Sequence, residues 1–232
     1  MRRPIWLPED AAPEALPPVA QALDDPDGLL AVGGALTPAW LLYAYRHGVF
    51  PWYSPGQPIL WWSPDPRTVL FPQEFRCSRS LAQSIRNRGY ETRIDTAFAT
   101  VINACAAPRA TDSGTWITRE MRAAYVQLHC QGAAHSVETW SGDCLVGGLY
   151  GVTIGRVFYG ESMFTRSRDA SKVALARLVD ECRRRDVRLI DCQMATEHLF
   201  SLGSRTLPRA RFVRLLEDWA DPSLQLWRDS DG

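Results

Sequence analysis

The chain has 232 residues, 46% of them hydrophobic, and its 26 basic and 26 acidic residues give a formal net charge of +0. This length allows one large domain or a large domain with a small companion, and the apolar content supports a buried core. The sequence holds no apolar run near the roughly 20 residues of a membrane span, and residues 1–6 do not resemble a signal peptide, so we expect a cytoplasmic protein with no membrane partner.

The first third of the chain is rich in proline and aromatic residues. Residues 29–34 are typical of a short strand that ends in a turn, and Thr37-Pro38 predicts the start of a helix that Gly48 ends. An aromatic turn follows over residues 49–62, and Pro64-Asp65-Pro66 reads as a linker. We therefore predict a small N-terminal domain over residues 1–65 and a larger domain over residues 66–232.

The larger domain alternates helices with strands. Apolar residues at helical spacing predict helices, and β-branched and aromatic runs predict strands. The predicted helices are 78–88, 96–106, 118–131, 169–185, a short one from 196 and a last one around 212–219, and the predicted strands are 91–94, 134–140, a hairpin over 147–164, and 187–193. This order gives an α+β fold with a mostly antiparallel sheet, which suits the N-acyltransferase folds.

Two strand ends carry polar residues. The hairpin delivers Glu161 into apolar surroundings, where a lone carboxylate is costly unless it has a partner or a function. Asp191 and Gln193 end the next strand two residues apart, so we expect both side chains on one face and Cys192 on the other. A carboxylate and an amide in this position can bind and orient an amine.

The cysteines, histidines and arginines limit the kinds of site that the chain can form. The six cysteines are scattered singly and no histidine pair completes a zinc site, so we expect reduced thiols, no metal and no cofactor. Lys172 is the single lysine among the 26 basic residues, and arginine's planar fork suits phosphate. The positive charge concentrates at Arg183, Arg184, Arg185 and Arg188 and at Arg205, Arg209, Arg211 and Arg214. Two interpretations are open here, a basic face for nucleic acid and a solvated helix face.

Eight collinear segments resemble one family, the leucyl/phenylalanyl-tRNA–protein transferases. Together they span roughly residues 28–213, and several of them contain tryptophan. They are Gly-Leu-Leu-Ala-Val-Gly-Gly from Gly28, Gly-Val-Phe-Pro-Trp-Tyr from Gly48, Trp-Trp-Ser-Pro-Asp-Pro-Arg from Trp61, Gly-Thr-Trp-Ile-Thr from Gly114, Ala-His-Ser-Val-Glu from Ala134, Gly-Glu-Ser-Met-Phe from Gly160, Leu-Ile-Asp-Cys-Gln from Leu189 and Ser-Leu-Gly from Ser201.

The resemblance implies an enzyme that moves leucine or phenylalanine, and sometimes methionine, from aminoacyl-tRNA to proteins whose N-terminus is arginine or lysine. The product is an N-end rule degradation signal. The implied fold is a small N-terminal domain with a larger acetyltransferase-like (GNAT-type) domain, and nothing demands more than a monomer.

The resemblance also assigns residues. It implies that Trp52 and Trp116 hold the terminal adenosine, that Glu161 lies near the amino group of the transferred residue, and that Asp191 and Gln193 lie beside the attacking amine. The remaining substrate-binding residues would be Tyr45, Tyr125, Leu149, Met163 and Phe164, and tRNA phosphates would contact Arg183, Arg184, Arg185, Arg209, Arg211 and Arg214.

Structural interpretations of these residues are open at this point. Trp52 and Trp116 fit core aromatics, Glu161 could pair with Arg166 or Arg168, and Gln193 could cap the following helix. His135 and His198 fit structural roles better than catalytic ones. Two other functions also fit parts of the sequence: an acyl-coenzyme A N-acyltransferase with the same fold, and a non-catalytic tRNA-binding module.

Overall fold

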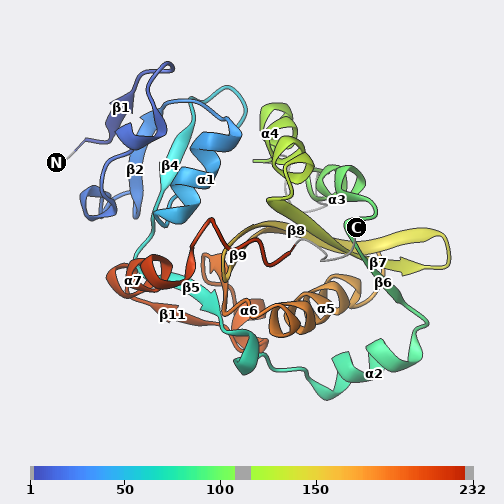
Figure 1. The fold of residues 1–232 in the computed structure, drawn as a ribbon. Helices are drawn as coiled ribbons and strands as arrows, with labels where there is room; N and C mark the ends of the chain where they lie inside the picture. Colours follow the sequence, from blue (N-terminus) through green and yellow to red (C-terminus); the bar gives the residue numbers. More distant parts are fainter. Residues whose placement is uncertain (1–2, 108–115, 228–232) are drawn as a thin grey trace.

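The computed structural model describes residues 3–107 and 116–227 (Figure 1). Gly114 and Thr115 of the predicted Gly-Thr-Trp-Ile-Thr segment lie outside the described residues, whereas Trp116 lies inside them. Among the described residues, no helix is long and apolar enough to cross a membrane.

The N-terminal part is a four-stranded sheet with one α-helix. The sheet has the order β1-β2-β4-β3, and its strands are β1 (Ile5–Leu7), β2 (Leu29–Gly33), β3 (Phe50–Pro51) and β4 (Leu60–Trp62). Two 3-10 turns, Pro13–Ala15 and Val19–Gln21, connect the first two strands. Helix α1 (Pro38–Arg46) begins where the Thr37 side chain accepts a hydrogen bond from the backbone N–H of Trp40, as the Thr-Pro pair predicted.

The larger part is a seven-stranded sheet with the order β11-β5-β10-β9-β8-β7-β6. All its neighbouring strands are antiparallel except β9 and β10. The strands are β5 (Arg67–Leu70), β6 (Glu91–Ile94), β7 (Ala134–Ser141), β8 (Cys144–Ile154), β9 (Val157–Thr165), β10 (Leu189–Gln193) and β11 (Arg205–Leu207). The predicted α+β class, the mostly antiparallel sheet and the hairpin are confirmed.

Helices cover both faces of this sheet. Figure 1 shows α5 (Ala170–Arg184) on one face and α3 (Phe98–Cys105) and α4 (Arg119–Cys130) on the other. The remaining helices are α2 (Arg79–Asn87), which packs on α5, the 3-10 turn Pro72–Glu74, α6 (Glu197–Ser201) and α7 (Arg209–Trp219). Helix α5 links β9 to β10, so the one parallel pair is joined by a long crossover helix, as parallel strands require.

Strands β1, β3 and β4 of the N-terminal sheet were not predicted from the sequence, and neither were two strands of the larger sheet. Residues 67–70 follow the predicted linker directly and form β5, a central strand between β10 and β11. All four of its residues are buried, Arg67 and Thr68 included, so it shows no alternation of polar and apolar residues. Strand β11 has three residues, too few for a period to be visible.

Candidate active site

A cavity of about 470 Å³ lies where the N-terminal part meets β9, β10 and α5. Its walls come from distant parts of the chain: the turn after β3, Trp116, the β8–β9 hairpin, α5, and the segment that runs from β10 into α6. The lining residues that bear on the site are Phe50, Pro51, Trp52, Trp116, Leu149, Tyr150, Phe158, Glu161, Met163, Leu175, Leu178, Ile190, Cys192, Gln193, His198 and Leu199.

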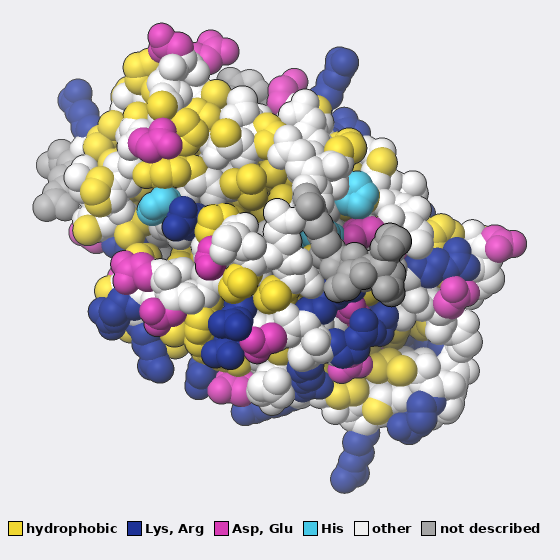
Figure 2. Space-filling model, viewed as in Figure 1, with side chains coloured by type: hydrophobic (Ala, Val, Ile, Leu, Met, Phe, Trp, Pro, Cys, Tyr) yellow, Lys and Arg dark blue, Asp and Glu magenta, His cyan; other side chains and the backbone are white. Residues whose placement is uncertain are grey.

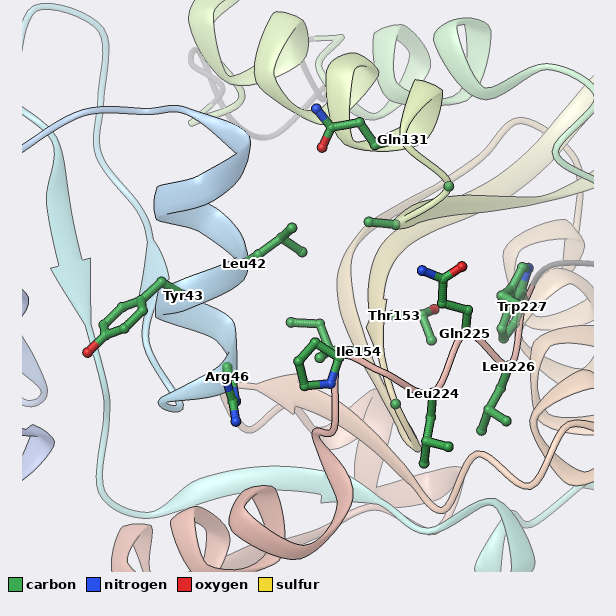
Figure 3. A pocket seen from close by; sticks show the side chains of 14 residues that line it. Leu42, Tyr43, Arg46, Gln131, Thr153, Ile154, Leu224, Gln225, Leu226 and Trp227 are labelled. Atoms are coloured by element: carbon green, nitrogen blue, oxygen red, sulfur yellow. The ribbon is translucent and has the colours of Figure 1, made fainter. Parts of the chain in front are cut away.

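A second cavity, of about 340 Å³, lies between α1, the end of α4, the end of β8 and the C-terminal segment (Figure 3). Leu42 and Arg46 of α1 face it from one side, and Gln225 and Trp227 face it from the other. The residues that line it include none of the predicted site residues. The cavity at Trp52 and Trp116 is therefore the candidate active site.

Glu161 sits in this cavity inside a hydrogen-bonded chain. The Tyr125 hydroxyl donates to Glu161 Oε2 at 2.8 Å, and the Gln193 side-chain amide donates to Oε1 at 2.7 Å. The Tyr45 hydroxyl bonds in turn to the Tyr125 hydroxyl. Glu161 is 8% exposed, and burial raises its pKa from 4.5 to about 7, although the three hydrogen-bonding side chains oppose that rise.

Tyr45 and Tyr125 were predicted to bind substrate directly. Both are fully buried, in α1 and α4, and they lie behind Glu161 rather than among the residues that line the cavity. Their visible role is to hold one oxygen of the Glu161 carboxylate. No sequence spacing indicates this chain of contacts, because its members lie on four separate elements.

Asp191 does not face the cavity. It is fully buried and forms a bidentate ion pair with Arg67: Nε donates to Oδ1 at 2.8 Å and Nη2 donates to Oδ2 at 2.7 Å. Asp191 Oδ1 also accepts the backbone N–H of Gln193 at 2.9 Å. Sequence analysis noted Arg67 only as the last residue of a family segment and missed this role.

Asp191 and Gln193 therefore do not line the cavity together, and Cys192, which was expected to face away from both, does line it. The pairing of β10 with β5 shifts register between Asp191 and Gln193, and Gln193 adopts a left-handed conformation with φ of +62°. This bulge breaks the two-residue period. As a result Cys192 and Gln193 both line the cavity, whereas Asp191 does not.

The two tryptophans line the cavity, and Trp116 also packs against the hydrophobic core. Trp52 is 38% exposed, and its ring meets the edge of Trp62 at 5.7 Å between centroids. The Trp62 indole N–H donates to the carbonyl of Trp52 at 2.7 Å, which holds the turn. Trp116 is half-buried. Accessible aromatic rings at a cavity provide stacking surfaces.

The inner part of the cavity is apolar. Leu149 and Met163 line it as predicted, together with Phe158, Leu175, Leu178, Ile190 and Leu199, whereas Phe164 lies outside the lining residues. Burial raises the pKa of the Cys192 thiol well above its ordinary value, which disfavours the thiolate form that a nucleophile needs.

Several of the predicted tRNA-binding arginines have internal partners. Arg183 contacts Asp180 at 3.3 Å, and Arg184 and Arg185 contact the buried Glu181 at 3.1 and 2.6 Å. Arg209 donates to the carbonyl of Ser63 at 2.5 Å. Arg211 and Arg214 are exposed on α7. Figure 2, in the same view as Figure 1, shows basic side chains interspersed with acidic ones over the lower part of the molecule.

The contacts of the polar residues decide between the structural interpretations that the sequence left open. Glu161 bonds to Tyr125 and Gln193, while Arg168 lies near Asp169. Thr196, not Gln193, caps α6. His135 contacts Asp95 at 2.7 Å, which is a structural role, and His198 lines the cavity. The six cysteines carry free thiols, and the described residues hold no cluster of three metal-ligating side chains.

A mostly antiparallel sheet with one parallel pair, and beside that pair an apolar cavity with a buried carboxylate, is the arrangement that the sequence led us to expect of an N-acyltransferase fold. The family descriptions agree. Residues 69–217 match the model of the leucyl/phenylalanyl-tRNA protein transferases, and residues 34–65 match the model of the N-terminal domain of the same proteins. The chain belongs to the leucyl/phenylalanyl-tRNA protein transferase family, and it is an aminoacyltransferase.

Relatives of known name support this membership. A leucyl/phenylalanyl-tRNA–protein transferase of Aromatoleum aromaticum is 58% identical over 216 residues, which cover 93% of this chain and 90% of the relative. One from Azoarcus sp. is 60% identical over 205 residues, covering 88% and 87%. The membership excludes the acyl-coenzyme A enzyme and the non-catalytic RNA-binding module.

Solved structures resemble the chain only weakly. L-PGS from Bacillus licheniformis has a TM-score of 0.41 at 12% identity, covering 56% of this chain and 46% of that one. A GCN5-related N-acetyltransferase from Kribbella flavida has a TM-score of 0.38 at 11% identity, covering 72% and 59%. These values carry no conclusion about the site.

Proposed function

We propose that this enzyme transfers leucine or phenylalanine, and to a lesser extent methionine, from aminoacyl-tRNA to the α-amine of proteins that begin with arginine or lysine. One observation carries the proposal: a single cavity combines an apolar interior, a buried carboxylate held by Gln193 and Tyr125, and two accessible tryptophans. These three features match the three parts of an aminoacyl-adenosine.

The donor fits in one orientation. An aliphatic or aromatic side chain enters the apolar interior around Leu149 and Met163, where its burial is favourable. Its α-amino group then lies at the Glu161 carboxylate, which attracts a cation and accepts hydrogen bonds. The terminal adenine stacks on Trp52 and Trp116, as unpaired bases do on aromatic side chains.

The reaction requires alignment more than a strong base. The acceptor nitrogen bonds to the ester carbonyl carbon, the bond from that carbon to the ribose oxygen breaks, and the proton lost by the amine ends on the released ribose hydroxyl. The acceptor α-amine has a pKa near 7.7–8.0, so a useful neutral fraction exists at neutral pH. Holding the two reactants in place supplies much of the acceleration.

Asp191 and Gln193 take different parts in this proposal. Both oxygens of Asp191 are occupied, by Arg67 and by the backbone N–H of Gln193, so Asp191 is not available as the base. Gln193 lines the cavity, and its side chain touches Glu161. We assign Gln193 to contact with the reacting groups, and Asp191 to fixing the position of Gln193.

The finer assignments extend the family resemblance. We propose that the product is an N-end rule degradation signal, that the enzyme acts in the cytoplasm as a monomer, and that residues 1–65 and 66–232 are its two domains.

A transfer assay tests the proposal. The protein is incubated with labelled leucyl-tRNA and a peptide that begins with arginine, and label in the peptide is measured. We expect transfer to peptides that begin with arginine or lysine. We expect no transfer when the N-terminus of the same peptide is acetylated, and none when acetyl-coenzyme A replaces leucyl-tRNA as the donor. Equal use of alanyl-tRNA, or of a peptide that begins with alanine, would contradict the assigned specificity.

A further inference from the structure

Arg67 is a fully buried arginine at a junction of three segments. Besides its two bonds to Asp191, its Nη1 donates to the carbonyl of Gly48 at 3.1 Å. The guanidinium also lies over two aromatic rings, at 4.8 Å from the centroid of Phe50 and 4.7 Å from that of Phe212. Its position is therefore fixed from all sides by α7, β10 and the turn that leads to β3.

This fixed guanidinium reaches the cavity through Asp191. Asp191 Oδ1 accepts from both Arg67 Nε and the backbone N–H of Gln193, so the two donors share one oxygen. Gln193 has φ of +62°, a conformation that a residue with a side chain adopts only when its surroundings hold it there. Its side chain then meets Glu161 Oε1 at 2.7 Å.

We infer that Arg67 is a positioning residue of the transfer reaction: through Asp191 it holds Gln193, and through Gln193 it sets the orientation of Glu161 in the cavity. This inference rests on the proposed function. Arg67 does not line the cavity, and its effect depends on the bidentate geometry of the guanidinium, which fixes the Asp191 carboxylate in one plane.

Lysine at this position separates charge from geometry. A lysine ammonium keeps the positive charge but cannot make two parallel bonds to one carboxylate while also reaching Gly48. In Arg67→Lys the Asp191 carboxylate becomes free to turn, and the backbone of Gln193 loses its fixed acceptor. Because small displacements at a reacting centre are costly, we expect kcat to fall on the order of 10²-fold.

The experiment measures kcat and KM for leucyl-tRNA, with a saturating peptide that begins with arginine, at a temperature well below the lowest Tm. The variants are Arg67→Lys, Asp191→Asn and the double variant. The control is Arg156→Lys, in which a half-buried arginine that pairs with Asp186 at 2.9 Å outside the cavity is changed in the same way. We expect Arg67→Lys to lower kcat while KM stays near the wild-type value, and the control to change neither.

The double variant tests whether Arg67 acts through Asp191. If it does, the kcat of the double variant falls no further than that of its less active parent, since both changes remove the same constraint. Multiplying losses would overturn the inference, and so would a near wild-type kcat or a rise in KM alone in Arg67→Lys. Failure of the wild-type protein to transfer leucine at all would instead overturn the proposed function.

If Arg67→Lys fails to fold, a second variant tests the inference. Arg67→Met with Asp191→Leu replaces the buried pair by apolar side chains, an exchange that proteins often tolerate without loss of stability. This variant also removes the acceptor of the Gln193 N–H. A large loss of kcat at unchanged KM supports the inference, and near wild-type kcat overturns it.

Discussion

At the scale of single residues, Glu161 is a carboxyl group that the fold keeps away from water. Burial raises its pKa from 4.5 to about 7. The folded state therefore holds this proton more tightly than the unfolded chain does. The contribution of Glu161 to the free energy of unfolding is thus greatest below about pH 4.5 and is lost as the pH rises towards 7.

We predict that Glu161→Gln removes this dependence. The stability of the wild type relative to Glu161→Gln should decrease between pH 4.5 and about pH 7 and level off above it. Urea unfolding of both proteins across this range measures the difference. Glu217→Gln, a change at an exposed glutamate of α7, is the control and should follow the wild type. A difference independent of pH would contradict the raised pKa.

The tryptophans give a prediction about binding. Trp52→Ala and Trp116→Ala should raise KM for aminoacyl-tRNA with little change in kcat, because stacking on one base is worth about 1–3 kcal/mol. Steady-state kinetics with each variant measures both constants. Trp6→Ala is the control, since Trp6 is 71% exposed on β1 and does not line the cavity. A fall in kcat at constant KM would show that these rings are not the adenosine platform.

Asp191 and Gln193 should differ in what their removal costs. Asp191→Ala leaves the Arg67 guanidinium buried without its partner, and breaking such a pair costs about 3–5 kcal/mol. Gln193→Ala removes a half-buried side chain, so it should leave Tm nearly unchanged and lower kcat on the order of 10²-fold. Thermal unfolding and transfer assays on both variants separate the two roles, and equal Tm values for the two variants would contradict this division.

At the scale of elements, α5 rests on β8 at a glycine. A methyl group on Gly147 would lie 2.6 Å from Cβ of Ala170 and 2.8 Å from its carbonyl carbon. These distances are too short, so helix and strand must move apart in Gly147→Ala. We predict a loss of about 1–3 kcal/mol of stability, measured by urea unfolding. Gly160→Ala is the control, because its nearest neighbour would lie at an ordinary 3.5 Å. Equal midpoints would contradict the close packing of α5.

The elements show what a sequence pattern can and cannot predict. Helix α1 was predictable because Thr37, Pro38 and Gly48 each act on neighbouring backbone. The β8–β9 hairpin was predictable for the same reason. Strand β5 was not predictable, because Arg67 and Thr68 are buried there by partners more than 100 residues away in the sequence. From the sequence alone, an arginine is predicted to lie on the surface, even where its guanidinium is in the core.

Some residues of the candidate site were likewise predictable from the sequence, and others were not. Glu161 was predictable, because a carboxylate in apolar surroundings stands out in the sequence. Motif resemblance pointed to Gln193 and to the tryptophans, which do line the cavity. The orientation of Asp191 was not predictable, because it follows from one bulge in β10, and a bulge is a property of strand pairing rather than of local sequence.

At the scale of the whole molecule, the two parts of the chain meet at the candidate active site. The N-terminal part supplies Trp52, and the larger part supplies Glu161 and Gln193. Arg67, just after the linker, bonds to both parts, at Gly48 and at Asp191. An aminoacyl-tRNA is much larger than this cavity, so its remaining phosphates must meet the outer surface.

Two pairs of arginines, on α7 and on α5, differ in their contacts on that surface. Arg211 and Arg214 are exposed on α7, whereas Arg183 and Arg184 contact Asp180 and Glu181 of their own helix. Arginines already paired with carboxylates release fewer counterions when a phosphate approaches. We therefore expect the α7 pair, rather than the α5 pair, to contribute to the salt dependence of tRNA binding.

Salt titration of tRNA binding tests this with two matched double variants. Arg211→Ala with Arg214→Ala should flatten the slope of log K against log salt by about one unit for each phosphate that the variant no longer binds. Arg183→Ala with Arg184→Ala should leave the slope near the wild-type value. Transfer from aminoacyl-adenosine, which lacks those phosphates, should be unaffected in both variants. An unaltered slope for the α7 variant would show that tRNA lies on another face, and a flattened slope for the α5 variant alone would show that tRNA displaces the internal partners of Arg183 and Arg184.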